Sequence, residues 1–155
     1  MLSVTEIFRS IQGESTRAGC VCSFVRLSGC NLDCTYCDTA YAREPGTEME
    51  IDQVQSLVAA HGTRLVEVTG GEPLLQEAAP ELCWRFIDSG YTVLVETNGT
   101  CDISRLPLGV LLIMDIKCPG SGMAGHLRLD NIAKLRRHDE VKFVLCNEDD
   151  YRWAA

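Results

Sequence analysis

The sequence lacks a long apolar stretch near its start, because Glu6 and Arg9 interrupt the opening MLSVTEIFRSIQGES. Neither a signal peptide nor a membrane span fits that opening, so we expect a cytoplasmic protein that makes no membrane contact. Positive charge is also scarce, and the formal net charge is -8. Binding that neutralises many phosphates is therefore disfavoured, and nucleic acid is not an expected partner.

Repeats, low-complexity runs and linker-like stretches are absent as well, and 155 residues suit one domain better than two. Hydrophobic residues make up 46% of the chain and charged residues 23%, the ordinary balance of a globular protein. We therefore expect a single packed domain over residues 1–155.

The residue pattern predicts an α/β fold. Extended segments at 5–10 and 21–28 indicate an opening hairpin. Ile51, Val54, Leu57 and Val58 then recur on one helical face, which ends before Gly62. Further strands are expected at 65–69, 91–96, 110–116 and 140–145, with helices at 75–89, at 130–137 and in a short acidic segment after the last strand. This alternation favours βα units around a parallel sheet, whose ligand-binding loops follow the carboxyl ends of the strands.

Nine cysteines stand out in a chain without a secretion signal. The cytosol keeps thiols reduced, so metal binding explains them better than disulfides. The segment GCNLDCTYCDT brings Cys30, Cys34 and Cys37 into one short loop. Three thiolates on a four-iron cluster would leave one iron open to a chelating ligand. A zinc site remains the alternative: no histidine is near, but Cys20 or Cys22 could supply its fourth ligand.

A glycine-rich segment follows one predicted strand, and single polar residues follow the next two. In VEVTGGEP, residues 66–73, Gly70 and Gly71 would let a ligand approach the backbone, and Glu72 could accept from an ammonium group. Alone, this segment could be only a turn before a helix-starting proline, but its position after a three-cysteine loop favours binding. Asn98 and Lys117 follow the next strands at the same sheet edge, which favours a ligand contact over a tight turn and a solvated charge.

The C-x3-C-x2-C spacing, with Tyr36 before the last cysteine, resembles the radical S-adenosylmethionine (radical SAM) superfamily. The resemblance implies a partial (βα) barrel, an open parallel sheet with helices outside. It also implies a [4Fe-4S] cluster on Cys30, Cys34 and Cys37 whose open iron binds S-adenosyl-L-methionine, and whose electron releases a 5′-deoxyadenosyl radical. The cofactor contacts that it implies are Tyr36, Cys37, Asp38, Gly70, Gly71, Glu72, Asn98 and Lys117.

Three further segments narrow the resemblance to the 7-carboxy-7-deazaguanine synthase family of queuosine biosynthesis. They are IFRSIQGES, the arginine of SFVRLSGCNLDC and the CDT that closes the cysteine loop. The resemblance implies substrate contacts from Ile11, Gln12, Gly13, Glu14, Arg26 and Thr69, and a magnesium ligand at Thr39. A guanidinium can grip a carboxylate with two parallel hydrogen bonds, and a hydroxyl oxygen suits Mg²⁺. A surface ion pair at Arg26 and loop capping at Thr39 are the alternatives.

The same resemblance implies a radical SAM carbon-nitrogen lyase. The deoxyadenosyl radical would take hydrogen from carbon 6 of 6-carboxy-5,6,7,8-tetrahydropterin, the ring would contract and ammonia would leave, with magnesium steering the rearrangement and the cofactor regenerated. An electron donor such as flavodoxin and a homodimer are also expected by resemblance, although the sequence itself identifies neither. Family members continue beyond the segment that matches EVKFVLCNEDDYRWA, so we expect a C-terminal end shortened relative to the family.

Two other functions compete. An activase that takes hydrogen from a glycine of pyruvate formate-lyase or anaerobic ribonucleotide reductase would share the cysteine loop and GGEP, but would not need Gln12, Arg26 and Thr39 together. A non-catalytic metal-binding or electron-transfer protein should have four protein ligands. The other six cysteines have no assigned role, and the apolar neighbours of Cys118 do not mark it as reactive.

Overall fold

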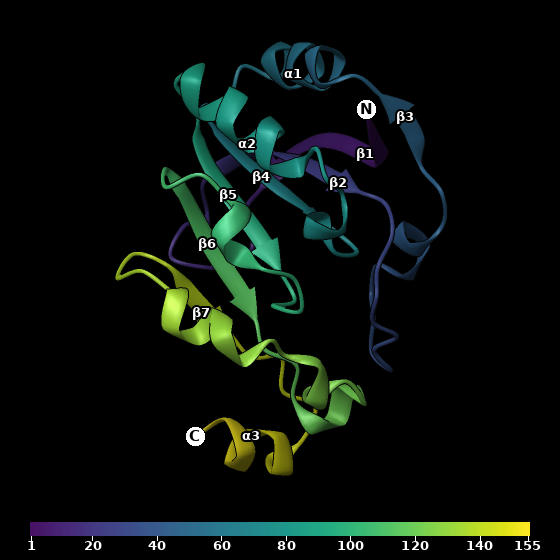
Figure 1. Cartoon of the computed structure of the whole chain (residues 1–155), viewed down its shortest axis with the longest axis vertical. Helices are drawn as coiled ribbons and strands as arrows, with labels where there is room; N and C mark the ends of the chain where they lie inside the picture. Colours follow the sequence, from purple (N-terminus) through teal and green to yellow (C-terminus); the bar gives the residue numbers. More distant parts are fainter.

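The computed structural model describes residues 1–155, and its centre is a seven-stranded sheet in the order β3-β1-β2-β4-β5-β6-β7 (Figure 1). Its strands are β1 (Leu2–Ile11), β2 (Val21–Leu27), β3 (Thr47–Met49), β4 (Leu65–Gly70), β5 (Thr92–Thr97), β6 (Val110–Asp115) and β7 (Glu140–Lys142). β1 pairs antiparallel with β2 and β3, and every other neighbouring pair is parallel. The predicted α/β fold and the opening hairpin are confirmed.

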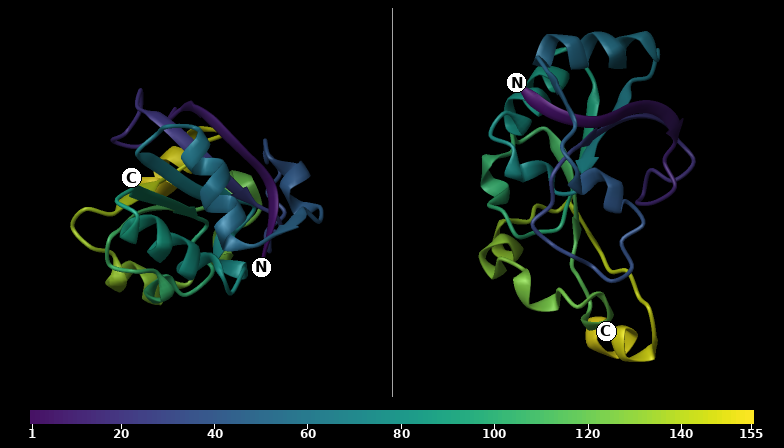
Figure 2. Two further views of the ribbon diagram at one scale, coloured as in Figure 1. Left: turned by 90° about the horizontal axis from the view of Figure 1, so that it is seen from above. Right: turned by 90° about the vertical axis from the view of Figure 1, so that its right-hand side faces the viewer.

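Two helices cover one face of this sheet: α1 (Ile51–Ala60) and α2 (Ala79–Asp88). A capping box between Glu50 and Gln53 begins α1, which satisfies two of the free N–H groups at its first turn. Val54 and Val58 of α1 and Phe86 of α2 are fully buried in the larger hydrophobic core, together with residues of β1, β2, β4, β5 and β6. Figure 2 shows these helices outside the strands.

A second, smaller apolar cluster lies on the other face, which the curved sheet encloses. It consists of Cys22, Phe24, Leu65, Leu94 and Ile113, with Phe8 and Leu111 packed against it. Strand alternation explains the division, because successive residues of a strand point to opposite faces. Phe24 therefore faces the inside while its neighbour Val25 joins the core under the helices.

The inside is closed by contacts between distant parts of the chain. The loop after β1 reaches β7, where Thr16 Oγ1 donates to Glu140 Oε1 at 2.6 Å and Lys142 Nζ donates to Glu14 Oε2 at 2.6 Å. Because β1 and β7 lie far apart in the sheet order, these contacts require the sheet to curl. The sheet therefore forms a partial barrel, as the resemblance implies.

Several predicted boundaries are wrong. The helix expected at 75–89 begins only at Ala79, because a short 3-10 turn at Pro73–Leu75 precedes it and Gln76 is extended. The segment expected as a helix at 130–137 is a 3-10 helix, Leu129–Lys134, which ends where Leu135 becomes extended. The last strand pairs with β6 only through Glu140–Lys142, not to residue 145.

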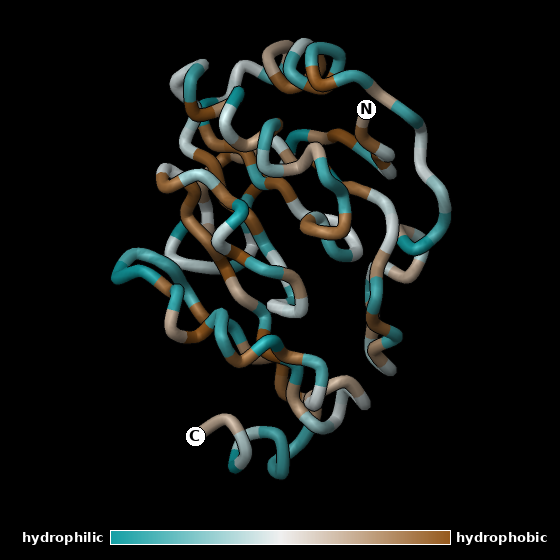
Figure 3. The backbone as a smooth tube through the Cα atoms, in the orientation of Figure 1, coloured by the Kyte–Doolittle hydropathy of each residue, from teal (hydrophilic) through white to brown (hydrophobic).

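The edge strand β3 was not predicted, since three residues are too short a run to show alternation. The short acidic helix after β7 is present as α3 (Glu148–Ala154). Figure 3 shows the hydrophobic stretches on the central strands, whereas α3 is mostly hydrophilic. No helix has the length and apolar character needed to cross a membrane.

Candidate active site

A cavity of about 430 Å³ opens at the carboxyl ends of the parallel strands. Every residue that the sequence predicted as a site residue lines it except Ile11 and Glu72. These lining residues are Gln12, Gly13, Glu14, Arg26, Cys30, Cys34, Tyr36, Cys37, Asp38, Thr39, Thr69, Gly70, Gly71, Asn98 and Lys117. The small interior cluster around Phe24 and Leu94 lies earlier on the same strands. Phe24 of this cluster also lines the cavity, so the cavity has both apolar and polar walls.

The loop with the three cysteines forms one wall. It is tied to the rest of the chain by Gly29 N, which donates to Ala42 O at 2.7 Å, and by Thr35 N, which donates to Ser121 O at 3.0 Å. Burial raises the pKa of the Cys34 thiol, Lys117 opposes that rise, and Cys30 and Cys37 add to it. The three thiols are therefore close enough to influence one another.

This donor set fits a multi-iron cluster better than one ion. No three His, Cys, Asp or Glu side chains are grouped tightly enough to hold a single metal ion. Neither cysteine considered as a fourth zinc ligand lines the cavity, and Cys22 lies in the interior apolar cluster. A cubane spreads its iron atoms, so its cysteine ligands can be farther apart than ligands of one zinc ion.

The two glycines of TGGEP have a structural cause beyond ligand access. A Cβ on Gly70 would lie 2.2 Å from Leu27 O, and a Cβ on Gly71 would lie 2.3 Å from Gly29 O and 2.6 Å from Cys30 Cβ. In addition, Glu72 N donates to Gly29 O at 2.8 Å. Both glycines therefore let β4 pack directly against β2 and the start of the cysteine loop.

Glu72 is fully buried behind the cavity wall. Its carboxylate accepts from Asn98 N at 2.7 Å, from Thr97 Oγ1 at 2.9 Å and from Leu74 N at 2.9 Å. Burial raises its pKa against these hydrogen bonds. The side chain thus joins the ends of β4 and β5, while the predicted contact with an ammonium group stays a prediction.

Arg26 and Ile11 differ in position. Arg26 lines the cavity, and its Nε donates to Glu6 Oε1 at 2.8 Å, so it has the ion pair considered as the alternative and also faces the site. Ile11 is 62% exposed and does not line the cavity. A contact from Ile11 to the substrate stays a prediction.

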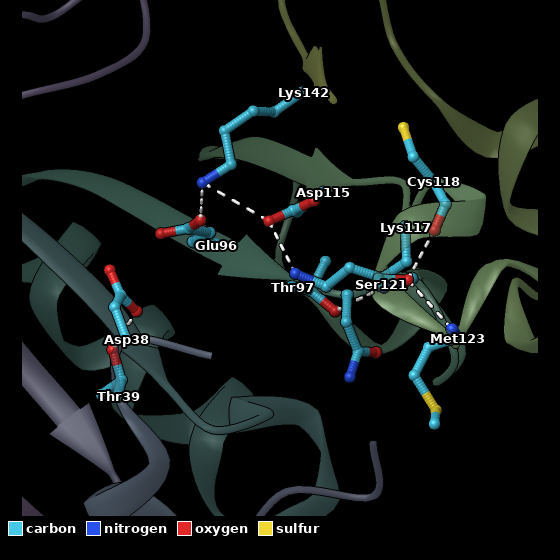
Figure 4. A network of polar contacts seen from close by, with 12 residues as sticks. Asp38, Thr39, Glu96, Thr97, Asp115, Lys117, Cys118, Ser121, Met123 and Lys142 are labelled. Atoms are coloured by element: carbon cyan, nitrogen blue, oxygen red, sulfur yellow. Dashed lines mark hydrogen bonds and ion pairs between the residues drawn. The ribbon is translucent and has the colours of Figure 1, made fainter. Parts of the chain in front are cut away.

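Charged residues inside the strands were missed by the sequence reasoning. Glu67, Glu96, Asp115 and Lys142 also line the cavity. Figure 4 shows Lys142 directed at Glu96 and Asp115, with Lys142 Nζ 3.5 Å from Asp115 Oδ2. For the three carboxylates, the available signal was a charged residue in an otherwise apolar strand, in VEV, VET and MDI.

The same network perturbs several ionisable groups. Burial raises the pKa of Glu67 to about 8, and the negative charge of Glu96 adds to the rise. For Lys117, burial alone would lower the pKa, but Asp115 at 2.8 Å outweighs it and the pKa is raised. Such shifted values are frequent where ligands bind.

Three buried polar atoms of residues that line the cavity lack a hydrogen-bond partner within the chain: Tyr36 OH, Arg43 Nε and Asp115 Oδ1. Buried polar atoms in folded proteins usually have partners. Thr39 and Asp38 add adjacent oxygen atoms, linked by a hydrogen bond of 2.7 Å from Thr39 Oγ1 to Asp38 Oδ1 (Figure 4). The cavity therefore offers both unpaired polar atoms and hard oxygen donors to a ligand.

Comparisons with known proteins agree with this geometry. The family profile described as "Radical SAM superfamily" matches residues 24–108. A 7-carboxy-7-deazaguanine synthase of Koribacter versatilis is 46% identical, over 99% of this chain and 69% of its own length. The enzyme of that name from Chlorobaculum tepidum is also 46% identical, over 99% of this chain and 71% of its own. The crystal structure of QueE from Escherichia coli matches with a TM-score of 0.69 over 98% of this chain and 87% of that one; at 18% identity, it supports the fold alone.

Proposed function

The chain belongs to the 7-carboxy-7-deazaguanine synthase family of the radical SAM superfamily, and we propose that it contracts the ring of 6-carboxy-5,6,7,8-tetrahydropterin with loss of ammonia. The reaction is the carbon-nitrogen lyase chemistry of queuosine biosynthesis. Relatives of that name match almost the whole chain, so a glycyl-radical activase is not favoured.

We assign cofactor binding to the wall of the cavity that the three-cysteine loop forms. Cys30, Cys34 and Cys37 would hold a [4Fe-4S] cluster and leave one iron for S-adenosyl-L-methionine. When bound, this pair supplies a 5′-deoxyadenosyl radical. Tyr36, Asp38, Gly70, Gly71, Asn98 and Lys117 would contact the cofactor, and Glu72 would act by holding Asn98. The unpaired hydroxyl of Tyr36 supports a polar ligand there.

Substrate binding is assigned to other residues that line the same cavity. Arg26 would bind the substrate carboxylate, because the only hydrogen bond of its side chain within the chain uses Nε and leaves its two terminal nitrogens free. Gln12, Gly13, Glu14 and Thr69 would contact the ring. Mg²⁺ is proposed at Thr39, whose hydroxyl lies beside the Asp38 carboxylate.

One observation carries the proposal. Gln12, Arg26 and Thr39 come from three separate segments, yet they line the same cavity as the three cysteines. A small-molecule radical enzyme needs its substrate beside its radical source, and an activase would not need this set. The homodimer, an electron donor such as flavodoxin and the cytoplasmic location stay predictions.

The test is a turnover assay of anaerobically reconstituted protein, reduced with dithionite and supplied with cofactor and tetrahydropterin. We expect 7-carboxy-7-deazaguanine and ammonia, identified by mass and by a coupled assay. Cys34→Ala should abolish product and 5′-deoxyadenosine, whereas the matched Cys20→Ala should retain both. Cofactor cleavage that the tetrahydropterin does not stimulate, but a glycyl-radical partner does, would reject the proposal.

A further inference from the structure

Only the side chain of Gln12 is available to bind a ligand in the cavity. Its backbone is already used, because Gln12 N donates to Cys20 O at 2.8 Å and Gln12 O accepts from Gly19 N at 2.8 Å. The residue is 5% exposed and lines the cavity. A ligand contact at position 12 must therefore come from the amide group.

Two neighbours determine which way that amide faces. Gln12 Oε1 accepts from Glu14 N at 3.1 Å, and Gln12 Nε2 donates to Glu67 Oε2. A backbone N–H can only donate, so Glu14 N requires Oε1 at its end of the amide; Glu67 then accepts from Nε2 through an ionised oxygen or, when neutral, through its carbonyl oxygen. Both contacts therefore select the same orientation, and one N–H of Nε2 remains for an acceptor atom of a ligand.

Glu67 orients the Gln12 amide from a strand that is not adjacent to β1. It lies on β4, whereas Gln12 directly follows β1, so the Gln12 side chain spans the intervening strand β2. Glu67 is 3% exposed. Its environment includes Cys22 from β2, Glu14 from the β1–β2 loop, Glu96 from β5 and Lys142 from β7.

The hydrogen bond between Gln12 and Glu67 can form whether Glu67 is neutral or ionised. A neutral carboxylic acid keeps a carbonyl oxygen that can accept from an amide N–H, and an ionised one accepts more strongly. Glutamine at position 67 would also keep an acceptor of the same shape, whereas leucine would remove it. This difference separates a hydrogen-bonding role from simple filling of the space.

We propose that Glu67 is a positioning residue, which holds the Gln12 amide in the one orientation that donates to the ring of the substrate. This inference rests on the proposed function of the cavity. It assigns to Glu67 no bond-making or bond-breaking step. It also implies that the ring has an acceptor atom, a carbonyl oxygen or an unprotonated nitrogen, where it meets Gln12.

Steady-state kinetics of the reconstituted enzyme test the proposal. Loss of one hydrogen bond in a binding site corresponds to roughly a three- to tenfold change, so Glu67→Leu should raise the KM for the tetrahydropterin by about that factor with kcat little changed. Glu67→Gln should keep KM within about twofold. In a Gln12→Leu background, Glu67→Leu should raise KM no further, because the residue acts through Gln12.

An additional KM increase in the Gln12→Leu background would overturn the proposal, because Glu67 would then contact the substrate itself. Equal KM increases for Glu67→Gln and Glu67→Leu would overturn it too.

A second measurement does not depend on turnover. In ¹⁵N spectra of the reconstituted, oxidised protein, we expect one Gln12 side-chain amide proton to exchange slowly with solvent. Glu67→Leu should abolish this protection and Glu67→Gln should keep it. If the wild-type protein fails to turn over the tetrahydropterin but shows the protected proton, the proposed function fails and the positioning of Gln12 stands. If Glu67→Leu leaves the proton protected, the positioning role is rejected.

Discussion

At the scale of single residues, the Arg26 guanidinium is bound within the chain through its Nε alone. Its Nε donates to Glu6 Oε1, which also accepts from Tyr41 OH at 2.7 Å. Arg26→Lys should raise the KM for the tetrahydropterin by about tenfold, because an ammonium cannot replace a planar two-nitrogen grip. Iron content should not change. Initial rates and iron analysis measure both quantities.

The matched control for that substitution is Arg9→Lys, since Arg9 is exposed on β1 and makes no ion pair. It should leave the KM for the tetrahydropterin unchanged. An unaltered KM in Arg26→Lys would show that the guanidinium does not bind the substrate carboxylate.

Glu67 should make stability depend on pH. Its folded-state pKa of about 8 lies above its ordinary value of 4.5, so the folded state binds more protons between these two pH values. The contribution of protonated Glu67 to the free energy of unfolding is fully present below about pH 4.5 and is lost as pH rises through about 8. Glu67→Gln removes this dependence. Between pH 5 and pH 8.5 the unfolding free energy of the variant should rise relative to wild type by about 1–4 kcal/mol.

Denaturant titrations at both pH values measure that difference, and subtraction of wild type from variant cancels the other titrating groups. A difference that stays constant with pH would contradict a raised pKa at Glu67.

At the scale of elements, the contact between β4 and the cysteine loop depends on Gly71. Gly71→Ala would push its Cβ into Gly29 O and Cys30 Cβ. We expect the loop to shift and the iron content after reconstitution to fall below about half. Gly125→Ala is the control, since a Cβ there meets no atom within 4 Å, and it should retain full iron. Equal iron in both variants would show that the loop tolerates the displacement.

Lys142 connects β7 to the opposite end of the sheet. It forms ion pairs with Glu14, Glu96 and Asp115, and is 21% exposed. Lys142→Met would leave three carboxylates without their shared cation, which should cost about 3 kcal/mol of unfolding free energy. Urea denaturation measures the change.

The control for Lys142 is Lys134→Met, which removes a single, more accessible pair with Asp102. Its urea midpoint should move much less, since solvent screens exposed pairs. A loss as large in Lys134→Met would contradict the role of Lys142 in joining the two ends of the sheet.

At the scale of the whole molecule, the cluster should stabilise the fold. The cysteine loop is irregular and is attached by few hydrogen bonds, among them Thr35 Oγ1 to Gly120 O at 2.8 Å. A cluster bound by the folded state alone shifts the equilibrium toward it. Removal of iron with a chelator should lower the Tm by about 5 °C or more, measured by scanning calorimetry under anaerobic conditions. Cys34→Ala should show the lower Tm with or without iron.

Most of the sheet could be predicted because its strands are apolar runs bounded by turn residues, as in LVEVTG and VLLIMD. The segment 129–134 could not be predicted. Its Asn131 side chain donates to Gly99 O at 2.9 Å and Cys101 O at 2.6 Å, so contacts with a distant loop determine its shape. Local propensity carries no information about such partners.

The sequence by itself determined the cysteine loop and the order of the longer strands and of the α-helices, because both depend on the spacing of neighbouring residues. Only the tertiary structure decided which charges meet in the cavity. Glu67, Glu96, Asp115 and Lys142 are far apart in the chain, and they converge because parallel strands in register point alternate residues to one side. It also decided that Glu72 supports the wall from behind, since burial depends on how β4 and β5 pack.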